Sequence, residues 1–259
     1  MEIDVPTSVG PGRLTVSAAE SPSAVLWLGH GAGGGIDAVD LAALAARLPA
    51  LGITVVRYEQ PWRVAGKRVA ARPETLDIAW RETAPRVRDL AGGLPLVVGG
   101  RSAGARVACR TATELGAAGV VCLAFPLHPP GKPETSRLAE LLAPDVPVLV
   151  LQGSRDLFGT AETLESETLA AETPVAGTPV AETRGAETPA AETPAAEVRG
   201  RDTIRIVEVP GADHGMKVLK GAAVTAADVR DLISATVAGF VSVLALDHEE
   251  GAADGPGQS

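Results

Sequence analysis

Three residues in the chain are of the types that form a nucleophilic triad. Ser102 lies at the centre of the Gly-x-Ser-x-Gly pentad at 100–104, Asp156 follows the stretch LQGSR, and His214 lies in GADHG. A serine hydroxyl becomes a strong nucleophile when a histidine takes its proton and a carboxylate orients that histidine. The order nucleophile, acid, base is the one expected where each group follows a strand of an α/β sheet. We therefore predict that Ser102 is the nucleophile, His214 the base and Asp156 the orienting acid.

A glycine-rich stretch, GHGAGGG at 29–35, could position backbone amides beside this serine. A phosphate-binding loop is the alternative, and it requires a Walker-type Lys-Ser/Thr or a Gly-x-Gly-x-x-Gly pattern that opens directly into a helix. The lysine is absent, and no acidic residue stands at the end of the next strand where a ribose would need it, Glu59 being the nearest candidate. We expect instead that the amides of Ala32 and Ala103 face the oxyanion that forms during acyl transfer.

Other residues could replace the proposed acid and base. Asp213 is a rival acid, although a residue adjacent to the base is expected to point elsewhere, and Asp156 could simply cap a turn. His128 is a rival base at the pocket mouth, whereas His30 is expected to shape the glycine-rich loop through hydrogen bonds. His30, His128 and Arg101 are the candidates for lining the pocket. Arg101 is expected to point to solvent, and contact with a substrate carboxylate is the alternative.

Short apolar runs alternate with segments of helical periodicity, which predicts a mostly parallel sheet with helices on both faces. The predicted strands are Ala24–Leu28, Ile53–Tyr58, Pro95–Val98, Gly119–Ala124, Val146–Leu151 and Ile204–Val209, with an early antiparallel strand at 13–18. The predicted helices are Val39–Leu51, Leu76–Leu90, Ala105–Leu115, Arg137–Leu142 and Thr225–Leu246. In such sheets, binding sites form at the carboxyl ends of the strands, where Ser102, Asp156 and His214 are expected.

These motifs together resemble the α/β-hydrolase superfamily, and most closely a small dienelactone-hydrolase-like branch. That branch is related to the α/β-hydrolase domain of a subunit of the non-specific-lethal chromatin complex. The similar stretches are GHGAGGG (29–35), RYEQPWRVAGKR (57–68), GGRSAGARVA (99–108), FPLHPPGKP (125–133), LQGSRDLFG (151–159) and GADHG (211–215). The resemblance implies the α/β-hydrolase fold and a serine hydrolase triad; this chain has Ser102 where dienelactone hydrolases use a cysteine. Because no long insertion follows the strand ending at Ala124, we expect no large cap domain.

The 259 residues carry a net charge of -9, but the acidity is concentrated in two segments. Residues 161–200 form eight AETPA-type pentads with eight Glu and two Arg, and the tail at 247–259 has four acidic residues and no basic ones. Four prolines interrupt the pentads, so we expect extended coil, preceded by a short helix over 161–170 that Thr160 caps. The predicted organisation is one domain over 1–246, interrupted by 161–200 and followed by a disordered acidic tail.

Composition limits the classes of partner and cofactor. An acidic chain with pI about 5.0 is not expected to bind nucleic acid. The apolar run at 232–246 is shorter than a membrane span, so we expect a buried helix and no membrane association. Cys109 and Cys122 lie in apolar contexts without clustered histidines, which predicts reduced core residues, no metal, no cofactor and a cytoplasmic location.

The function expected from these features is cleavage of a small-molecule ester or thioester by a serine hydrolase through an acyl-enzyme. The alternative is a catalytically silent module with the same fold, which uses its acidic repeat and tail to bind a partner. Labelling of Ser102 by an active-site-directed reagent distinguishes the two hypotheses.

Overall fold

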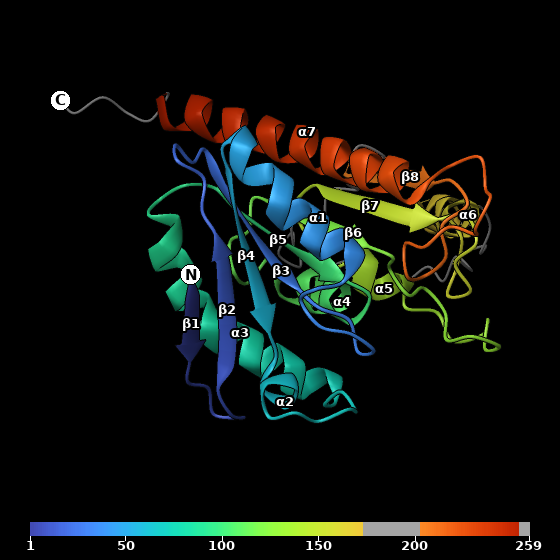
Figure 1. Cartoon of the computed structure of the whole chain (residues 1–259), viewed down its shortest axis with the longest axis horizontal. Coiled ribbons are helices and arrows are strands. Elements are labelled where there is room, and N and C mark those ends of the chain that lie inside the picture. Colours follow the sequence, from blue (N-terminus) through green and yellow to red (C-terminus); the bar gives the residue numbers. More distant parts are fainter. Residues whose placement is uncertain (173–202, 254–259) are drawn as a thin grey trace, which may run out of the picture.

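The computed structural model describes residues 1–172 and 203–253, which form an eight-stranded sheet covered by helices on both faces (Figure 1). The strand order is β1-β2-β4-β3-β5-β6-β7-β8. Strands β3 to β8 run parallel, whereas β2 pairs antiparallel with both β1 and β4. The predicted fold class, an α/β-hydrolase fold with a mostly parallel sheet and no large cap, is confirmed.

The strands are β1 (Glu2–Val5), β2 (Gly12–Ser17), β3 (Ala24–Gly29), β4 (Ile53–Glu59), β5 (Leu96–Arg101), β6 (Gly119–Leu123), β7 (Val148–Gly153) and β8 (Ile204–Val209). The helices are α1 (Val39–Arg47), the 3-10 helix η1 (Leu48–Leu51), α2 (Pro61–Val64), α3 (Pro73–Ala91), α4 (Ala103–Thr111), α5 (Leu138–Leu141), α6 (Ala161–Glu172) and α7 (Ala226–Ala253). Every strand predicted from the sequence is present with small shifts at its ends; β1 and α2 were not predicted.

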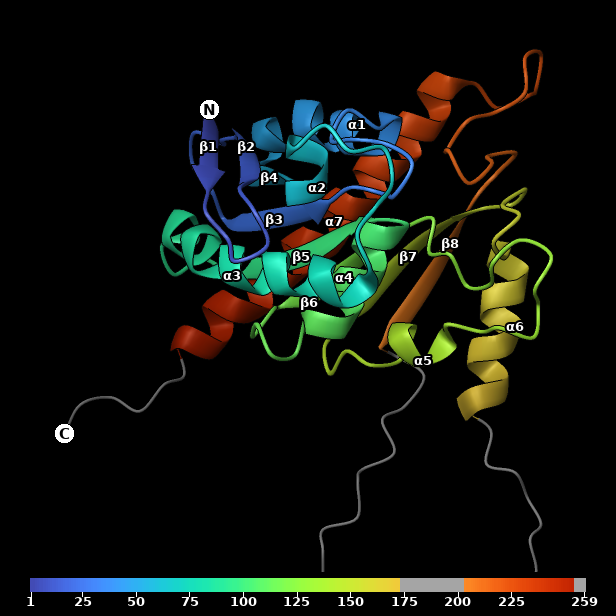
Figure 2. The ribbon, with the colours of Figure 1, turned by 90° about the horizontal axis from the view of Figure 1, so that it is seen from below.

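Alternation along the buried strands divides the apolar core into two layers. In β3, Val25 and Trp27 face one layer, which α3 and α4 cover, while Leu26 and Leu28 face the layer covered by α1 and α7. Figure 2 shows these helix pairs on opposite sides of the sheet. Because β3 is buried on both faces, it reads as a continuous apolar run, as expected for a central parallel strand.

The link from β6 to β7 is where larger relatives of this fold could carry a cap, and here it is short. Residues 124–147 contain a single four-residue helix, α5. The carboxyl ends of β5, β7 and β8 are therefore not covered by an inserted domain from this link.

The first pentads of the repeat form helix α6, the crossover between β7 and β8. The Thr163 amide donates to the Thr160 hydroxyl at 3.2 Å, as expected for the predicted cap. The rest of the predicted coil, 173–200, lies outside the described residues.

The C-terminal helix corrects one prediction. Helix α7 continues to Ala253, so the tail predicted to be disordered from residue 247 is helical over its first seven positions. The polar run at 247–250 has no helix-breaking proline, and its two glutamates are good helix formers that an already nucleated helix can add. Residues 254–259 lie outside the described part.

Helix α7 has the length and composition of a membrane span over Ala226–Gly251, with a mean hydropathy of 1.7 in its most apolar window. One face of the helix, including Ile233, Val237 and Val241, is fully buried against the sheet. This packing matches the buried helix predicted for the segment.

The two cysteines lie next to each other in the core, between α4 and β6. Their Sγ atoms are 3.4 Å apart, both thiols are free and both are buried. The hydrogen bond from Cys109, together with burial, raises the pKa of Cys122 well above its ordinary value. Deprotonation is therefore disfavoured, as expected for core thiols.

Candidate active site

Ser102 lies on a sharp turn between β5 and α4, with a backbone conformation that few non-glycine residues adopt (φ 51°, ψ −109°). The turn is held by a hydrogen bond from the Ser102 amide to the Leu123 carbonyl at 2.9 Å. This strain places the hydroxyl at the carboxyl edge of the sheet, where it lines a pocket.

The glycines that flank Ser102 are required by close backbone packing. A Cβ at Gly104 would lie 2.4 Å from the Gly29 carbonyl oxygen, and a Cβ at Gly100 would lie 2.5 Å from the same atom. The turn therefore packs directly against the end of β3, from which the glycine-rich loop departs. This contact brings the loop to the serine.

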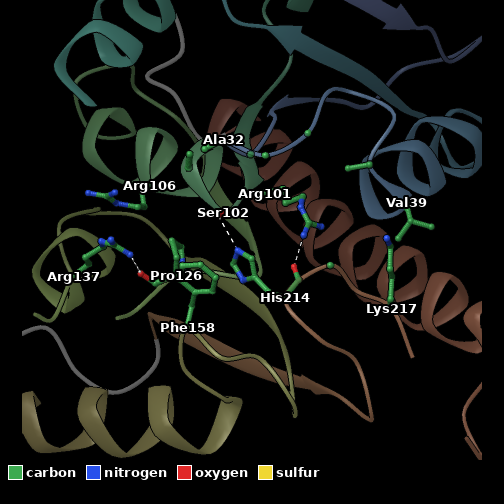
Figure 3. Close-up of a pocket in the computed structure, with 16 residues that line it drawn as sticks. Ala32, Val39, Arg101, Ser102, Arg106, Pro126, Arg137, Phe158, His214 and Lys217 are labelled. Carbon is green, nitrogen blue, oxygen red and sulfur yellow. Dashed lines mark hydrogen bonds between the residues drawn. The ribbon is translucent and has the colours of Figure 1, made fainter. Parts of the chain in front are cut away.

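The structure brings Ser102, His214 and Asp156 together in a continuous hydrogen-bonded series. The His214 Nε2 atom lies 3.0 Å from the Ser102 Oγ (Figure 3), and its Nδ1 lies 2.8 Å from the Asp156 Oδ2. The three residues follow β5, β8 and β7 respectively. This arrangement can move a proton from the serine to the imidazole and stabilise the imidazolium that forms.

Asp156 has no exposed side-chain surface, and each of its oxygens accepts hydrogen bonds. The Phe158 amide donates to Oδ1 at 2.8 Å, and the Gln152 Nε2 donates to Oδ2 at 3.0 Å beside His214. These contacts fix the orientation of the carboxyl group beside the imidazole. Gln152 is itself fixed by donation to the Phe125 carbonyl at 3.2 Å.

The backbone amides proposed for the oxyanion lie at the same place. Ala103 is the first residue of α4, and Ala32 lies in the glycine-rich loop; both line the pocket with Ser102. Within the described part of the chain, neither amide donates a hydrogen bond. Both are thus free to donate to a ligand, and the Ala103 amide also belongs to the helix N-terminus, which favours negative charge.

The pocket in front of Ser102 has a volume of about 580 Å³. The rings of Phe158 and His214 are 4.1 Å apart between centroids, so Phe158 limits the positions of the imidazole. Of the three predicted pocket-lining candidates, only Arg101 lines this pocket.

Arg101 does not point to solvent, which corrects the default expectation. Its NH1 donates to the buried Asp40 at 3.0 Å, and its NH2 donates to the main-chain carbonyl of His214. Burial raises the pKa of Asp40, against the opposing effect of the neighbouring Arg101 charge. Arg101 and Asp40 therefore act as positioning residues that tie α1 and the serine turn to the histidine loop.

His128 does not line the pocket, contrary to expectation. Its Nε2 lies 2.6 Å from the Glu167 carboxylate of α6, and its Nδ1 lies 3.3 Å from the Thr135 carbonyl. It connects the loop after β6 to the crossover helix, away from Ser102. The rival acid Asp213 is also separate from the triad: its Oδ1 accepts hydrogen bonds from the Gly215 and Lys217 amides.

His30 lies behind the glycine-rich loop and does not line the pocket in front of Ser102. Its Nδ1 lies 2.8 Å from the Gly31 carbonyl, and its Nε2 accepts a hydrogen bond from the Gln60 amide at 3.1 Å. Acceptance at Nε2 requires the neutral ring, with the proton on Nδ1. Burial lowers the pKa of His30, and the Arg63 charge contributes to this lowering.

We expect His30 to make the free energy of unfolding depend on pH. Its folded-state pKa is below the unfolded value of about 6.5, so below that pH the unfolded chain binds a proton that the folded protein excludes. Stability is then lost as the pH falls, by at most about 1.4 kcal/mol per pH unit from this group. Urea unfolding of wild type and His30→Gln between pH 7.5 and 5 measures it: the wild type should show the steeper loss. His248→Gln, at an exposed position on α7, is the matched control, and equal slopes for wild type and His30→Gln contradict the assignment.

The sequence did not reveal Asp40, Gln152 or Phe158 as site residues. Asp40 occupies the first turn of a helix, where acidic residues are common for electrostatic reasons alone. Gln152 and Phe158 lie in the strand-end stretch that contains Asp156, so proximity to the predicted acid was an available signal for both.

Comparison with known proteins identifies relatives of the fold. A family model described as an alpha/beta hydrolase domain matches residues 22–182. Among solved structures, an α/β serine hydrolase without lid from Xanthomonas campestris is 19% identical with a TM-score of 0.63, covering 93% of this chain and 94% of that one. Est1E from Butyrivibrio proteoclasticus with bound ferulic acid is 12% identical with a TM-score of 0.62, covering 93% and 99%. An alpha-beta serine hydrolase homologue from Coxiella burnetii is 15% identical with a TM-score of 0.61, covering 91% and 96%. A search of curated protein sequences found no match.

Proposed function

The chain belongs to the alpha/beta hydrolase domain family, and from this premise we propose that it is a serine hydrolase of small esters or thioesters. The observation that carries the proposal is the series Ser102 Oγ, His214 Nε2, His214 Nδ1 and Asp156 Oδ2, with separations of 3.0 and 2.8 Å. It lies at an uncapped pocket large enough for a small-molecule substrate.

In the first step, the Ser102 Oγ attacks the substrate carbonyl carbon while its proton passes to the His214 Nε2. The carbonyl oxygen becomes an oxyanion, to which the Ala32 and Ala103 amides donate. The bond to the leaving oxygen or sulfur then breaks, and that atom takes the proton from His214. The alcohol or thiol departs, and the acyl group remains on Ser102.

In the second step, His214 takes a proton from water, and the resulting hydroxide attacks the acyl carbon. The bond to Ser102 breaks, His214 returns the proton to the serine oxygen, and the carboxylic acid leaves. Asp156 stays ionised throughout and stabilises the imidazolium in both steps. The chemistry uses only these side chains and the two amides.

The non-catalytic alternative receives no support from the site geometry. A silent binding module has no need for a strained serine turn or for two free amides beside it, and strain of this type costs about 1–3 kcal/mol.

We also propose that the chain belongs to the dienelactone-hydrolase-like branch, because of the stretches at 57–68 and 125–133. We further propose a cytoplasmic location, because its two cysteines are free, buried thiols.

Fluorophosphonate labelling tests the proposal. We expect the folded protein to gain one covalent phosphonyl group, which peptide mass spectrometry places on Ser102, and to release p-nitrophenol from short acyl esters. Ser154→Ala is the matched control, because Ser154 lies near the site but its Oγ accepts a hydrogen bond from the Gly211 amide. A folded wild-type protein that neither labels nor hydrolyses any ester or thioester overturns the proposal in favour of the silent module.

A further inference from the structure

The pocket in front of Ser102 is lined by four basic side chains: Arg101, Arg106, Arg137 and Lys217. Among the described residues, no aspartate or glutamate lines it. Such an excess of one sign of charge in a concave site raises the local concentration of oppositely charged ligands. Each of the four charges is available to a ligand only where the protein does not already neutralise it.

Two of the arginines are paired with carboxylates of the protein. Arg101 is paired with the buried Asp40 at 3.0 Å. Arg106 makes a two-pronged contact with Glu140, at 2.8 and 2.6 Å. Glu140 also accepts from Arg110, whose other contacts are to Asp77, so these two arginines and two carboxylates neutralise each other.

Arg137 is different, because within the described part of the chain it has no carboxylate within ion-pair distance. Among the described residues, its guanidinium makes one hydrogen bond, which runs from NH1 to the Pro126 carbonyl at 2.7 Å. The side chain is partly buried, and burial together with the nearby Arg106 charge lowers the pKa of Arg137, with Glu140 opposing them less strongly. The guanidinium nonetheless keeps its charge, and its remaining N–H groups form a planar fork suited to a carboxylate or phosphate.

Arg137 lies on one side of the pocket and Lys217 on the other. In Figure 3, Arg106, Arg137, Pro126 and Phe158 lie on one side of the Ser102–His214 pair, while Lys217 and Val39 lie on the opposite side. Lys217 is exposed and carries a strongly hydrated point charge, which binds anions with less geometric selectivity. Of these two side chains, Arg137 therefore has the geometry that binds a carboxylate or phosphate more selectively.

We propose that the pocket selects esters or thioesters that carry a carboxylate or similar compact anion on one side of the scissile bond, and that Arg137 binds this anion. The proposal rests on the proposed function, because it assigns a substrate class to the same serine. An anion at Arg137 supplies the charge partner that residues 1–172 and 203–253 do not provide there. The anion that Arg137 binds belongs either to the acyl group or to the leaving group of the substrate. A carboxylate offers Arg137 the same hydrogen-bond acceptors in both cases.

Matched substrates test the proposal on each side. On the acyl side, the p-nitrophenyl monoester of adipic acid is compared with p-nitrophenyl hexanoate, which has a methyl group in place of the carboxylate. On the leaving-group side, 4-carboxyphenyl hexanoate is compared with 4-carbamoylphenyl hexanoate. In at least one pair, we expect the anionic ester to have a kcat/KM about tenfold higher at low ionic strength, because a charge-assisted hydrogen bond contributes about this factor. Since the charge is partly exposed, the preference should shrink as salt is added.

Variants assign the preference to a residue. Arg137→Gln should reduce it to about twofold or less, with the preference taken as the ratio of kcat/KM for the anionic and neutral esters of one pair in the same variant. Arg88→Gln is the matched control, because Arg88 also donates one hydrogen bond to a main-chain carbonyl, that of Leu115 at 3.0 Å, but does not line the pocket. If Arg137→Gln fails to fold, Arg137→Lys, which keeps the charge without the fork, should retain only part of the preference.

The outcomes separate this proposal from the proposed function. Equal rates for both members of both pairs, or a preference that survives Arg137→Gln and disappears in Lys217→Met, overturn the assignment to Arg137 while hydrolysis stands. If the folded wild type hydrolyses neither member of any pair and Ser102 does not label, the proposed function itself fails.

Discussion

Replacing Ser102 with alanine should lower kcat/KM for a p-nitrophenyl ester by about 10⁴-fold or more, because the only proposed nucleophile is removed. The remaining rate reflects the oxyanion amides and substrate binding, which the substitution leaves in place. The alanine fits the turn without new contacts, because it only removes the hydroxyl. Stopped assays with purified protein, corrected for spontaneous hydrolysis, measure the effect, and fluorophosphonate labelling should be lost with it.

Two controls separate chemistry from folding. Ser102→Gly should be equally inactive yet at least as stable as Ser102→Ala in urea unfolding, because glycine adopts φ 51° without strain. Ser154→Ala should keep its activity within about threefold, since the contact that the Ser154 hydroxyl makes is acceptance of a hydrogen bond from the Gly211 amide, outside the triad. Retained turnover in Ser102→Ala contradicts the nucleophile assignment.

The sheet could be predicted from the sequence because its central strands are buried on both faces and are bounded by glycine or proline. The runs that became β3, β6 and β7 are uninterrupted apolar stretches with no competing helical period. Strand β1 escaped prediction because it is a polar edge strand, Glu2-Ile3-Asp4-Val5, whose order comes from pairing with β2. The end of α7 was predicted too early, at residue 246. The acidic residues that follow were interpreted as disordered, whereas the helix continues through them to Ala253.

The site could be predicted as far as strand ends specify it. Residues that directly follow parallel strands must meet at one edge of the sheet, which is how Ser102, Asp156 and His214 were selected. Contacts that a side chain makes with residues distant in the sequence leave no such pattern. Arg101 donates to the carbonyl of His214, which is 113 positions away in the sequence. His128 contacts Glu167 on α6, a helix whose sequence has only a weak helical periodicity. Both orientations depend on the packed fold rather than on local sequence.

Replacing Asp156 with asparagine should lower kcat by about 10⁴-fold with little change in KM, because the substitution imposes the wrong histidine tautomer. In the wild type, Oδ1 accepts from the Phe158 amide, and Oδ2 accepts from both Gln152 and His214. An asparagine must place its NH₂ at one of these positions. At the Oδ1 position it faces the Phe158 N–H, and at the Oδ2 position it faces donors from Gln152 and His214. With its NH₂ at the Oδ2 position, the asparagine donates to the His214 Nδ1, and the imidazole proton moves to Nε2. A protonated Nε2 can no longer take the Ser102 proton.

The matched control for this effect is Asp213→Asn, in the loop of His214 itself. Within the described residues, the Asp213 side chain accepts only from the backbone amides of Gly215 and Lys217, so Asp213→Asn should lower kcat by less than about tenfold. Steady-state kinetics of both variants on the same ester, with thermal unfolding to verify folding, compare the two carboxylates directly. A larger loss in Asp213→Asn than in Asp156→Asn makes Asp213 the acid. Equal and small losses in both mean that His214 is oriented chiefly by other contacts, of which Phe158, at 4.1 Å between ring centroids, is the first to replace.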